Sequence, residues 1–329
     1  MKRVFVYEYL SGGGLIPSAG DAAVNDEAAA AALLPLGLSM RDALAQDLLQ
    51  VDGVSLSVAA SVRAPRVPRN AEPVRPRAGE SAFDFVARQA ALHDVAWVVA
   101  PETGGLLAQM QQVVGPARWL GCSAAAIAVA SGKRATLLRL AGQGLATPLA
   151  FEHVPEVERW VVKPDDGAGG VATRVHRSQE DALADWDRRS TAGSPMAIEP
   201  WVDGEPLSVS MLCTAGRTEL LSVNRQRITV DGAGALSFDG VDVNAIAVGG
   251  ERGPVLSRLA KHVAKGIPGL RGFVGIDLVW HPRCGPVVIE VNPRVTCAYV
   301  GLSASLGRNL AAELLQDHAA GHDAEDGDG

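Results

Sequence analysis

Carboxylate and amide side chains occupy matching places on two neighbouring predicted strands near the C-terminal end of the chain. Asp277 lies inside the apolar run 274–279, and Glu290 and Asn292 end the next apolar run. Because side chains alternate between the faces of a strand, Glu290 and Asn292 share a face, and a hairpin through 282–285 would bring Asp277 beside them. A buried carboxylate is costly unless it is paired or bound to a metal. Two carboxylates and an amide oxygen are hard ligands that suit Mg²⁺ shared with phosphate groups.

Arg294 follows this group by two residues, where its guanidinium could hold a phosphoryl oxygen. The alternative is a salt bridge between Asp277 or Glu290 and a buried arginine. Such a pair would also satisfy a carboxylate inside an apolar strand.

A lysine and a glycine-rich loop form a second candidate phosphate site. Lys163 ends a predicted strand at 160–163, and the loop 164–170 that follows contains Gly167, Gly169 and Gly170. A strand-end lysine can hold a phosphate as a point charge, and glycine lets backbone N–H groups approach anionic oxygens. No G-x-x-x-x-G-K-[ST] sequence occurs, so this is not a Walker loop. The alternative is a flexible hairpin with a surface lysine.

Two weaker signals accompany these sites. The segment 198–205 contains Glu199, Trp201 and Val202, where a strand entering a turn could frame an adenine edge with free backbone groups. The alternative there is an ordinary hairpin with surface acids. Lys133 stands earlier, on a predicted helix, where a single lysine is usually just solvated.

The elements that would position these residues fall into two sections of different texture. The first section has a predicted strand at 3–9, a serine and three glycines at 11–14, and a long helical region with an N-terminal signal at Asn25-Asp26-Glu27. A strand at 54–59, a helix at 81–93 and a strand at 95–100 follow. This alternation predicts a parallel sheet with helices on both faces.

The second section begins near residue 131 and is richer in strands. It has predicted helices at 131–144 and 254–266, a final helix after Tyr299, and predicted strands at 160–163, 196–202, 207–213, 220–223, 227–230, 273–280 and 286–291. The acidic C-terminal tail cannot bury apolar surface, and we expect it to be disordered.

Bulk composition limits the class of protein. The 329 residues allow two or three domains. A net charge of −7 without a basic stripe argues against nucleic acid as a partner. Four dispersed cysteines favour a reducing cytoplasm over a zinc site. Glu8 interrupts the first apolar run too early for a signal peptide, and the longest apolar stretch, 28–38, is too short to span a membrane.

As an ordered set, these pieces resemble the ATP-grasp superfamily over residues 120–315. The resemblance implies an α/β fold with an N-terminal parallel α/β domain at 1–120, a small lid subdomain at 121–200, a C-terminal mixed-sheet subdomain at 201–318 and a disordered tail at 319–329. It also implies that ATP and Mg²⁺ or Mn²⁺ are bound.

The resemblance further implies a role for each candidate residue. Lys133 and Lys163 would contact phosphate, and Lys163 would be catalytic together with Arg294, which would lie at the transferred phosphate. The loop glycines Gly167, Gly169 and Gly170 would cover the phosphates. Adenine would be bound by Glu199, Trp201 and Val202, and the metal by Asp277, Glu290 and Asn292. One departure concerns the ribose. Glu205 falls one place earlier than the ribose-binding acid of many relatives, so the ribose contact stays open between Glu205 and Asp203.

Within the superfamily, the segments 6–14, 101–104 and 121–123 resemble the tyramine–glutamate ligases of methanofuran biosynthesis. That resemblance implies an ATP-dependent carbon–nitrogen ligase that joins the γ-carboxylate of L-glutamate to tyramine through an acyl phosphate. The acceptor pocket would lie partly around 8–14 and 102–105. Small-molecule substrates and a homodimer, the commonest assembly, are the expected partners.

Three other functions are alternatives to this ligase. Another amino-acid, dipeptide or pterin–glutamate ligase would keep the fold and change the substrates. A non-catalytic nucleotide sensor would not need to retain Asp277, Glu290 and Asn292. A dinucleotide-binding dehydrogenase is disfavoured, because Pro17 stands where the third glycine of G-x-G-x-x-G should fall.

Overall fold

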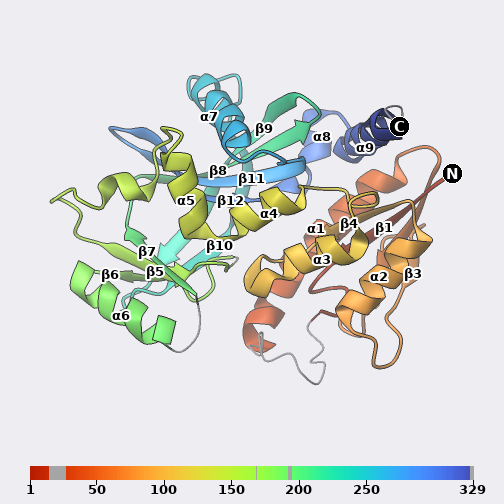
Figure 1. Ribbon diagram of the computed structural model, residues 1–329, viewed down its shortest axis with the longest axis horizontal. Helices are drawn as coiled ribbons and strands as arrows, with labels where there is room; N and C mark the ends of the chain where they lie inside the picture. The colour runs from red at the N-terminus through yellow and green to blue at the C-terminus, as the bar shows by residue number, and fades with distance from the viewer. Residues whose placement is uncertain (15–26, 168, 192–194, 327–329) are drawn as a thin grey trace. The chain divides into compact units, whose positions relative to one another are not determined.

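The computed structural model describes residues 1–14, 27–167, 169–191 and 195–326 (Figure 1). The chain forms two compact units. The first contains Met1–Ala124, Thr214–Gly216 and Arg294–Gly329, and the second contains Ala125–Cys213 and Arg217–Pro293.

The first unit is built on a parallel four-stranded sheet in the order β3-β2-β1-β4. Its strands are β1 (Lys2–Glu8), β2 (Val54–Ala59), β3 (Glu72–Val74) and β4 (Val95–Val99). All five residues of β4 and the last five of β1 are buried. Strands covered on both faces read as continuous apolar runs, which is why the sequence predicted them well.

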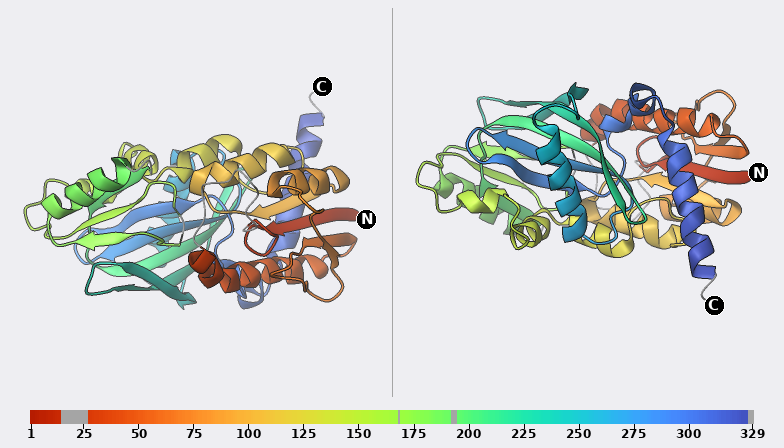
Figure 2. Two further views of the ribbon diagram at one scale, coloured as in Figure 1. Left: turned by 90° about the horizontal axis from the view of Figure 1, so that it is seen from below. Right: turned by 90° about the horizontal axis from the view of Figure 1, so that it is seen from above.

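Helices cover both faces of this sheet, as predicted (Figure 2). Helix α1 (Glu27–Leu49) packs on β1 and β2 on one face, and α2 (Ala82–Leu92) and α3 (Leu106–Val114) lie together on the other. The Ser81 hydroxyl caps α2 by accepting the Asp84 N–H at 3.1 Å. Two residues of the expected start signal of α1, Asn25 and Asp26, lie outside the described residues. A short 3-10 turn, η1 (Thr103–Gly105), precedes α3, and α4 (Ala124–Ser131) begins the second unit.

The C-terminal segment belongs to this first unit, which corrects our prediction that 294–318 is part of the C-terminal subdomain. It contains η3 (Cys297–Tyr299), α8 (Leu302–Leu306) and α9 (Leu310–Asp326). The segment belongs to the first unit because α9 and η3 both pack against α1 and bury apolar side chains there. Because α9 continues to Asp326, most of the tail that we predicted to be disordered is helical.

The carboxylate of Asp47 fixes the C-terminal segment against α1. The Asp47 side chain on α1 accepts hydrogen bonds from the Tyr299 hydroxyl at 2.6 Å and the Ser303 hydroxyl at 2.5 Å. The Asn309 amide donates to the Asp47 carbonyl at 2.7 Å. Burial, and then the charge of Asp47, raise the pKa of Tyr299 well above its usual value, so this hydroxyl remains a donor.

The second unit contains a five-stranded sheet in the order β10-β9-β8-β11-β12. Its strands are β8 (Glu205–Thr214), β9 (Arg217–Val230), β10 (Leu236–Ile246), β11 (Gly272–His281) and β12 (Gly285–Asn292), with antiparallel pairing of β10 with β9, of β8 with β11 and of β11 with β12. Helix α7 (Gly253–Gly266) packs on β9, and α5 (Lys133–Ala141) packs on β12.

The strand predictions for this sheet need two corrections. The predicted strands 220–223 and 227–230 are parts of one long strand, β9. We did not predict β10, because none of its residues is fully buried and several are polar. An edge strand held mainly by backbone pairing carries little apolar signal.

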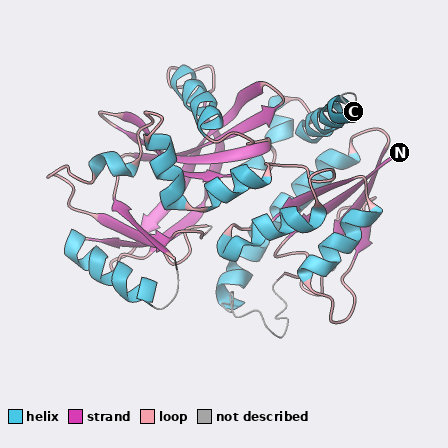
Figure 3. Cartoon of the chain, in the orientation of Figure 1, coloured by secondary structure: helices cyan, strands magenta, loops and turns pink. Residues whose placement is uncertain are grey.

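The rest of the second unit is a small antiparallel sheet, ordered β6-β5-β7, with one helix on it (Figure 3). Its elements are β5 (Trp160–Pro164), β6 (Arg174–His176), β7 (Met196–Pro200) and α6 (Gln179–Thr191), preceded by the 3-10 turn η2 (Pro148–Phe151). Trp160, Val162 and Ala182 form the core between the sheet and α6. We call β5, β6, β7 and α6 the lid.

The mixed α/β architecture with a parallel and an antiparallel part agrees with the predicted fold class. Among the helices that the structure describes, none is long and apolar enough to cross a membrane.

We expect Asp47→Ala to destabilise the first unit by about 1–3 kcal/mol, because it leaves the buried Tyr299 and Ser303 hydroxyls without their acceptor. Chemical denaturation would measure the loss. Asp52→Ala, at an exposed aspartate nearby, is the control and should change stability by less than about 0.5 kcal/mol. Equal stability of the two variants would contradict the role of Asp47.

Candidate nucleotide and metal site

A buried ion pair lies on the face of the lid sheet that is turned away from α6. Lys163 on β5 donates to a carboxylate oxygen of Glu199 on β7 at 2.6 Å, and both residues are at least 95% buried. The register places Lys163 opposite Ala197 and Val161 opposite Glu199, so both charged side chains leave the sheet on one side. Trp160 and Val162 point to the other side, toward α6. The alternation of β5 therefore decides that Lys163 faces away from the lid's apolar core.

The second predicted lysine begins a helix and meets the glycine loop. The Lys133 ammonium donates to the Gly167 carbonyl and lies 3.1 Å from a carboxylate oxygen of Glu290. Asp165 fixes the same helix start, since its carbonyl accepts the Lys133 N–H at 2.9 Å and its carboxylate accepts the Arg134 N–H at 2.8 Å. A carboxylate at a helix N-terminus is favoured by unpaired N–H groups and by the helix dipole. The loop 164–170 is thus attached to α5.

The glycines of this loop have the backbone angles that sequence reasoning required. Gly169 and Gly170 have φ values of 67° and 71°, in the left-handed region that side chains disfavour. A Cβ on Gly167 would lie 2.9 Å from the Pro164 side chain.

The β11–β12 hairpin brings the three predicted metal ligands together. Asp277 pairs directly with Glu290, and Gly275 pairs with Asn292. One Asp277 oxygen accepts the Asn292 amide at 3.2 Å, and the other accepts the Gln226 amide at 2.9 Å. Both oxygens of this carboxylate thus accept hydrogen bonds from side-chain amides.

Sequence reasoning missed Gln226 and the polar row beside it. Asn224 is fully buried and donates to the hydroxyls of Ser208 and Ser210 at 3.3 and 3.4 Å. The register pairs Ser208 with Asp277, so this row continues the face that carries the metal ligands. Polar residues alternating along two otherwise apolar strands were the available signal.

The donor set fits a hard divalent cation. Two carboxylates and an amide that can present its oxygen are ligands typical of Mg²⁺. Over the part of the chain that the structure describes, no three His, Cys, Asp or Glu side chains gather for a metal. This set depends on Asn292 as its third member, and phosphate oxygens would have to supply the remaining ligands.

Arg294, which we expect to face a transferred phosphate, is paired with a carboxylate in this structure. Its Nε and Nη2 donate to the two carboxylate oxygens of Glu102, each at 2.9 Å, in a buried bidentate pair within the first unit. Its Nη1 donates to the Val295 carbonyl. A phosphate would have to share this guanidinium with Glu102.

The residues expected to contact adenine and ribose also have partners within the chain. The Trp201 N–H, which we expected to be free, donates to the Arg159 carbonyl at 2.9 Å, while Val202 is buried. Arg159 stacks on the Trp201 ring at 4.9 Å and forms an ion pair with Asp203.

Glu205 lies on one face of β8, and Ser208 lies on the other. Arg252 and Arg225 lie 2.6 and 2.8 Å from its carboxylate and, with Arg252 as the larger cause, lower its pKa. The pairing of Glu205 with Trp280 and of Ser208 with Asp277 places Glu205 away from the metal ligands. The geometry therefore disfavours Glu205 as a ribose contact.

The glycine segment after β1 forms a compact turn in the first unit. The buried Glu8 carboxylate accepts the N–H groups of Leu10 and Ser11 at 3.0 and 2.8 Å. Burial raises the pKa of Glu8 above its usual value, although these hydrogen bonds oppose the shift. A Cβ on Gly12 would lie 2.4 Å from the Tyr7 ring, so the turn requires glycine there.

Comparison with known families matches two stretches of the chain to domain models. Residues 130–298 match the ATP-grasp domain, and residues 54–127 match the pre ATP-grasp 3 domain. The chain therefore belongs to the ATP-grasp family.

Two tyramine–L-glutamate ligases are similar to this chain in sequence. The protein from Methanocaldococcus jannaschii is 32% identical and that from Methanocaldococcus fervens 31% identical, each over 69% of this chain. The matches span 63% and 66% of the relatives' own lengths, which is less than two thirds of each.

Solved structures show the same fold at low identity. A putative ATP-grasp superfamily protein from Archaeoglobus fulgidus is 20% identical with a TM-score of 0.67, over 96% of this chain and 88% of that chain. The D-alanine–D-alanine ligase from Bacillus anthracis is 14% identical with a TM-score of 0.65, over 99% of this chain and all of that chain.

We expect Lys163→Met to destabilise the second unit by about 3–5 kcal/mol, because it leaves Glu199 buried without a counter-charge. The double variant Lys163→Met/Glu199→Met should recover much of that loss, since methionines of similar volume can fill the site. Urea denaturation would compare the three proteins. A double variant no more stable than Lys163→Met would show that Glu199 does not depend on this lysine.

Proposed function

We propose that this chain is an ATP- and Mg²⁺-dependent ligase that joins a carboxylate to an amine. The carrying observation is the arrangement on β11 and β12, where Asp277 is held by neutral amides beside Glu290 and Asn292. Two carboxylates and an amide oxygen on one face of a hairpin are ligands that suit Mg²⁺. Lys133 and Lys163 supply the positive charge that phosphate groups need.

The proposed substrates are L-glutamate, through its γ-carboxylate, and tyramine. Support comes from the two tyramine–L-glutamate ligases that match 69% of the chain. Other amino-acid ligases share the fold, among them an L-amino acid ligase from Bacillus licheniformis at 14% identity and a TM-score of 0.63.

The reaction would proceed in two balanced steps. A carboxylate oxygen attacks the γ-phosphorus of ATP, and the bond to the leaving ADP breaks, giving an acyl phosphate. The amine nitrogen then attacks the acyl carbon, the carbon–oxygen bond breaks, phosphate leaves and the nitrogen loses a proton. Catalysis in such a sequence rests on positioning and charge neutralisation.

Each group on the chain has a defined task in this proposal. Lys163 and Lys133 would hold phosphate oxygens after releasing Glu199 and the Gly167 carbonyl. Asp277, Glu290 and Asn292 would hold Mg²⁺, which supplies Lewis-acid neutralisation of the phosphate charge. The loop at 165–170 would cover the phosphates and keep water from the acyl phosphate. Arg294 remains a proposed phosphate contact that shares its guanidinium with Glu102.

The adenine and ribose would lie beside β7 and the turn that follows it. Glu199 and the backbone at Trp201 and Val202 remain the proposed adenine contacts. Asp203 is the better candidate for ribose, because Glu205 points to the other face of its sheet.

We expect Asp277→Asn and Glu290→Gln to keep the fold and to lower turnover by at least about a hundredfold, because each removes charge that would hold the metal. Phosphate release would measure turnover, and Mn²⁺ titration followed by electron paramagnetic resonance would measure metal binding separately. Asp242→Asn, at a half-exposed acid on β10 of the same sheet, is the control. Normal turnover and Mn²⁺ binding in the folded site variants would reject the metal assignment.

The substrate pair is tested by phosphate release from ATP and Mg²⁺ with L-glutamate, with and without tyramine, and by mass analysis of the product. We expect a coupled product only when both substrates are present. ATP binding without turnover would reject this pair and call for other acids and amines. Binding with no turnover for any pair would favour a nucleotide sensor.

A further inference from the structure

The lid is joined at its edge to the turn between β9 and β10. The Val175 N–H donates to the Gly234 carbonyl at 2.8 Å, and the Leu236 N–H donates to the Thr173 carbonyl at 3.1 Å. Gly234 has a φ of 82°, and a Cβ there would lie 2.2 Å from the Val175 carbonyl oxygen. Only glycine permits this close approach.

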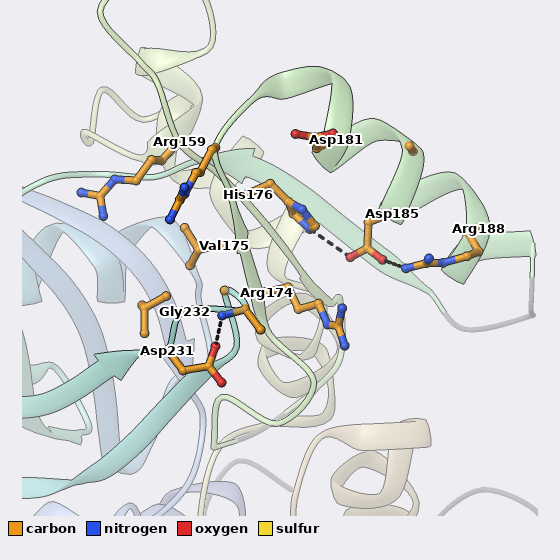
Figure 4. Close-up of a pocket in the computed structure, with 14 residues that line it drawn as sticks. Arg159, Arg174, Val175, His176, Asp181, Asp185, Arg188, Asp231 and Gly232 are labelled. Carbon is orange, nitrogen blue, oxygen red and sulfur yellow. Dashed lines mark hydrogen bonds and ion pairs between the residues drawn. The ribbon is translucent and has the colours of Figure 1, made fainter.

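A cavity of about 660 Å³ lies beside this junction (Figure 4). Its walls come from β6, α6 and the turn at 231–234. The basic residues that line it are Arg159, Arg174, His176, Arg177 and Arg188. In Figure 4, His176 points from β6 toward Asp185 on α6, and Arg188 meets the same carboxylate.

The cavity is separate from the nucleotide and metal site. Arg174 pairs with Val162, and His176 pairs with Trp160, so both side chains leave the lid sheet on the α6 side. Lys163 leaves the sheet on the opposite side.

The three acidic residues that line the cavity each accept hydrogen bonds from nearby groups, and one of them, Asp185, is also in an ion pair. Asp185 is bound by His176 at 3.1 Å and by Arg188; burial would raise its pKa, but these bonds lower it. Asp231 accepts the N–H groups of Ala233 and Ala235 at 2.9 and 2.8 Å.

The remaining acid, Asp181, accepts the Ser178 hydroxyl at 2.7 Å near the start of α6. By contrast, Arg174 and Arg177 are exposed, and neither forms an ion pair with another residue that the structure describes. Four arginines and three aspartates line the cavity, and two of these arginines, Arg174 and Arg177, present guanidinium groups that form no ion pair within the described part of the chain.

We propose that this cavity binds a small multivalent anion that carries phosphate or carboxylate groups, at a site distinct from the nucleotide site. Guanidinium groups match the planar oxygen pairs of such anions and bind them bidentately. Several arginines in one concave surface also concentrate anions from solution. An anion held between β6, α6 and the 231–234 turn reinforces the junction that fastens the lid.

The test uses inorganic pyrophosphate as the probe, titrated by calorimetry into the full chain without divalent metal. We expect saturable binding that weakens at least about tenfold in Arg174→Ser/Arg177→Ser and with added salt. The double variant Lys163→Met/Glu199→Met, which removes the ammonium on the other face of the lid sheet without leaving Glu199 unpaired, should keep this binding. Arg66→Ser/Arg69→Ser removes the same charge from exposed positions in the first unit and should also keep it.

Two further measurements locate and identify the anion. Pyrophosphate should slow hydrogen exchange at the Val175 and Leu236 amides, because these form the junction. Citrate in place of pyrophosphate distinguishes a carboxylate ligand from a phosphate ligand. No saturable binding of either anion, or binding lost in Lys163→Met/Glu199→Met and kept in Arg174→Ser/Arg177→Ser, would overturn the proposal. Neither result would bear on ligase activity, which is measured separately.

Discussion

The antiparallel register between β11 and β12 is the constraint on which the candidate site depends. It pairs Asp277 with Glu290 and places Asn292 two residues further along the same strand. The other face of this hairpin carries buried apolar residues such as Ile276 and Val291. A one-residue slip would send those residues to the polar face and the carboxylates into the core, so the apolar pattern holds the proposed metal ligands in place.

Charge compensation explains why candidate groups with different expected roles are found together. Lys163 is paired with Glu199, and Lys133 lies against Glu290. A buried ammonium or carboxylate is tolerated only with a partner. In the proposed function, phosphate and Mg²⁺ replace these partners, so the internal ion pairs mark the places that the ligands' charges would take.

The lid shows how one short strand can serve two surfaces. Alternation along β5 sends Trp160 and Val162 to the core with α6 and leaves Lys163 on the opposite face. Its neighbour β6 carries Arg174 and His176 on the α6 side, where the basic cavity lies. The Gly234 contact with Val175 then joins this lid to the larger sheet.

The sequence by itself determined the elements with strong local patterns. The buried parallel strands, the β11–β12 hairpin, the glycine loop after Lys163 and the closeness of Asp277 to Glu290 and Asn292 were all readable, because burial and alternation leave a direct trace in residue order. Tertiary structure alone decided which groups would become partners. The pairing of Arg294 with Glu102, the return of the C-terminal segment to α1, and the contact of Gln226 with Asp277 each join residues far apart in the chain. Edge strand β10 was missed for a related reason: it is held by backbone pairing with β9, which no local residue pattern records.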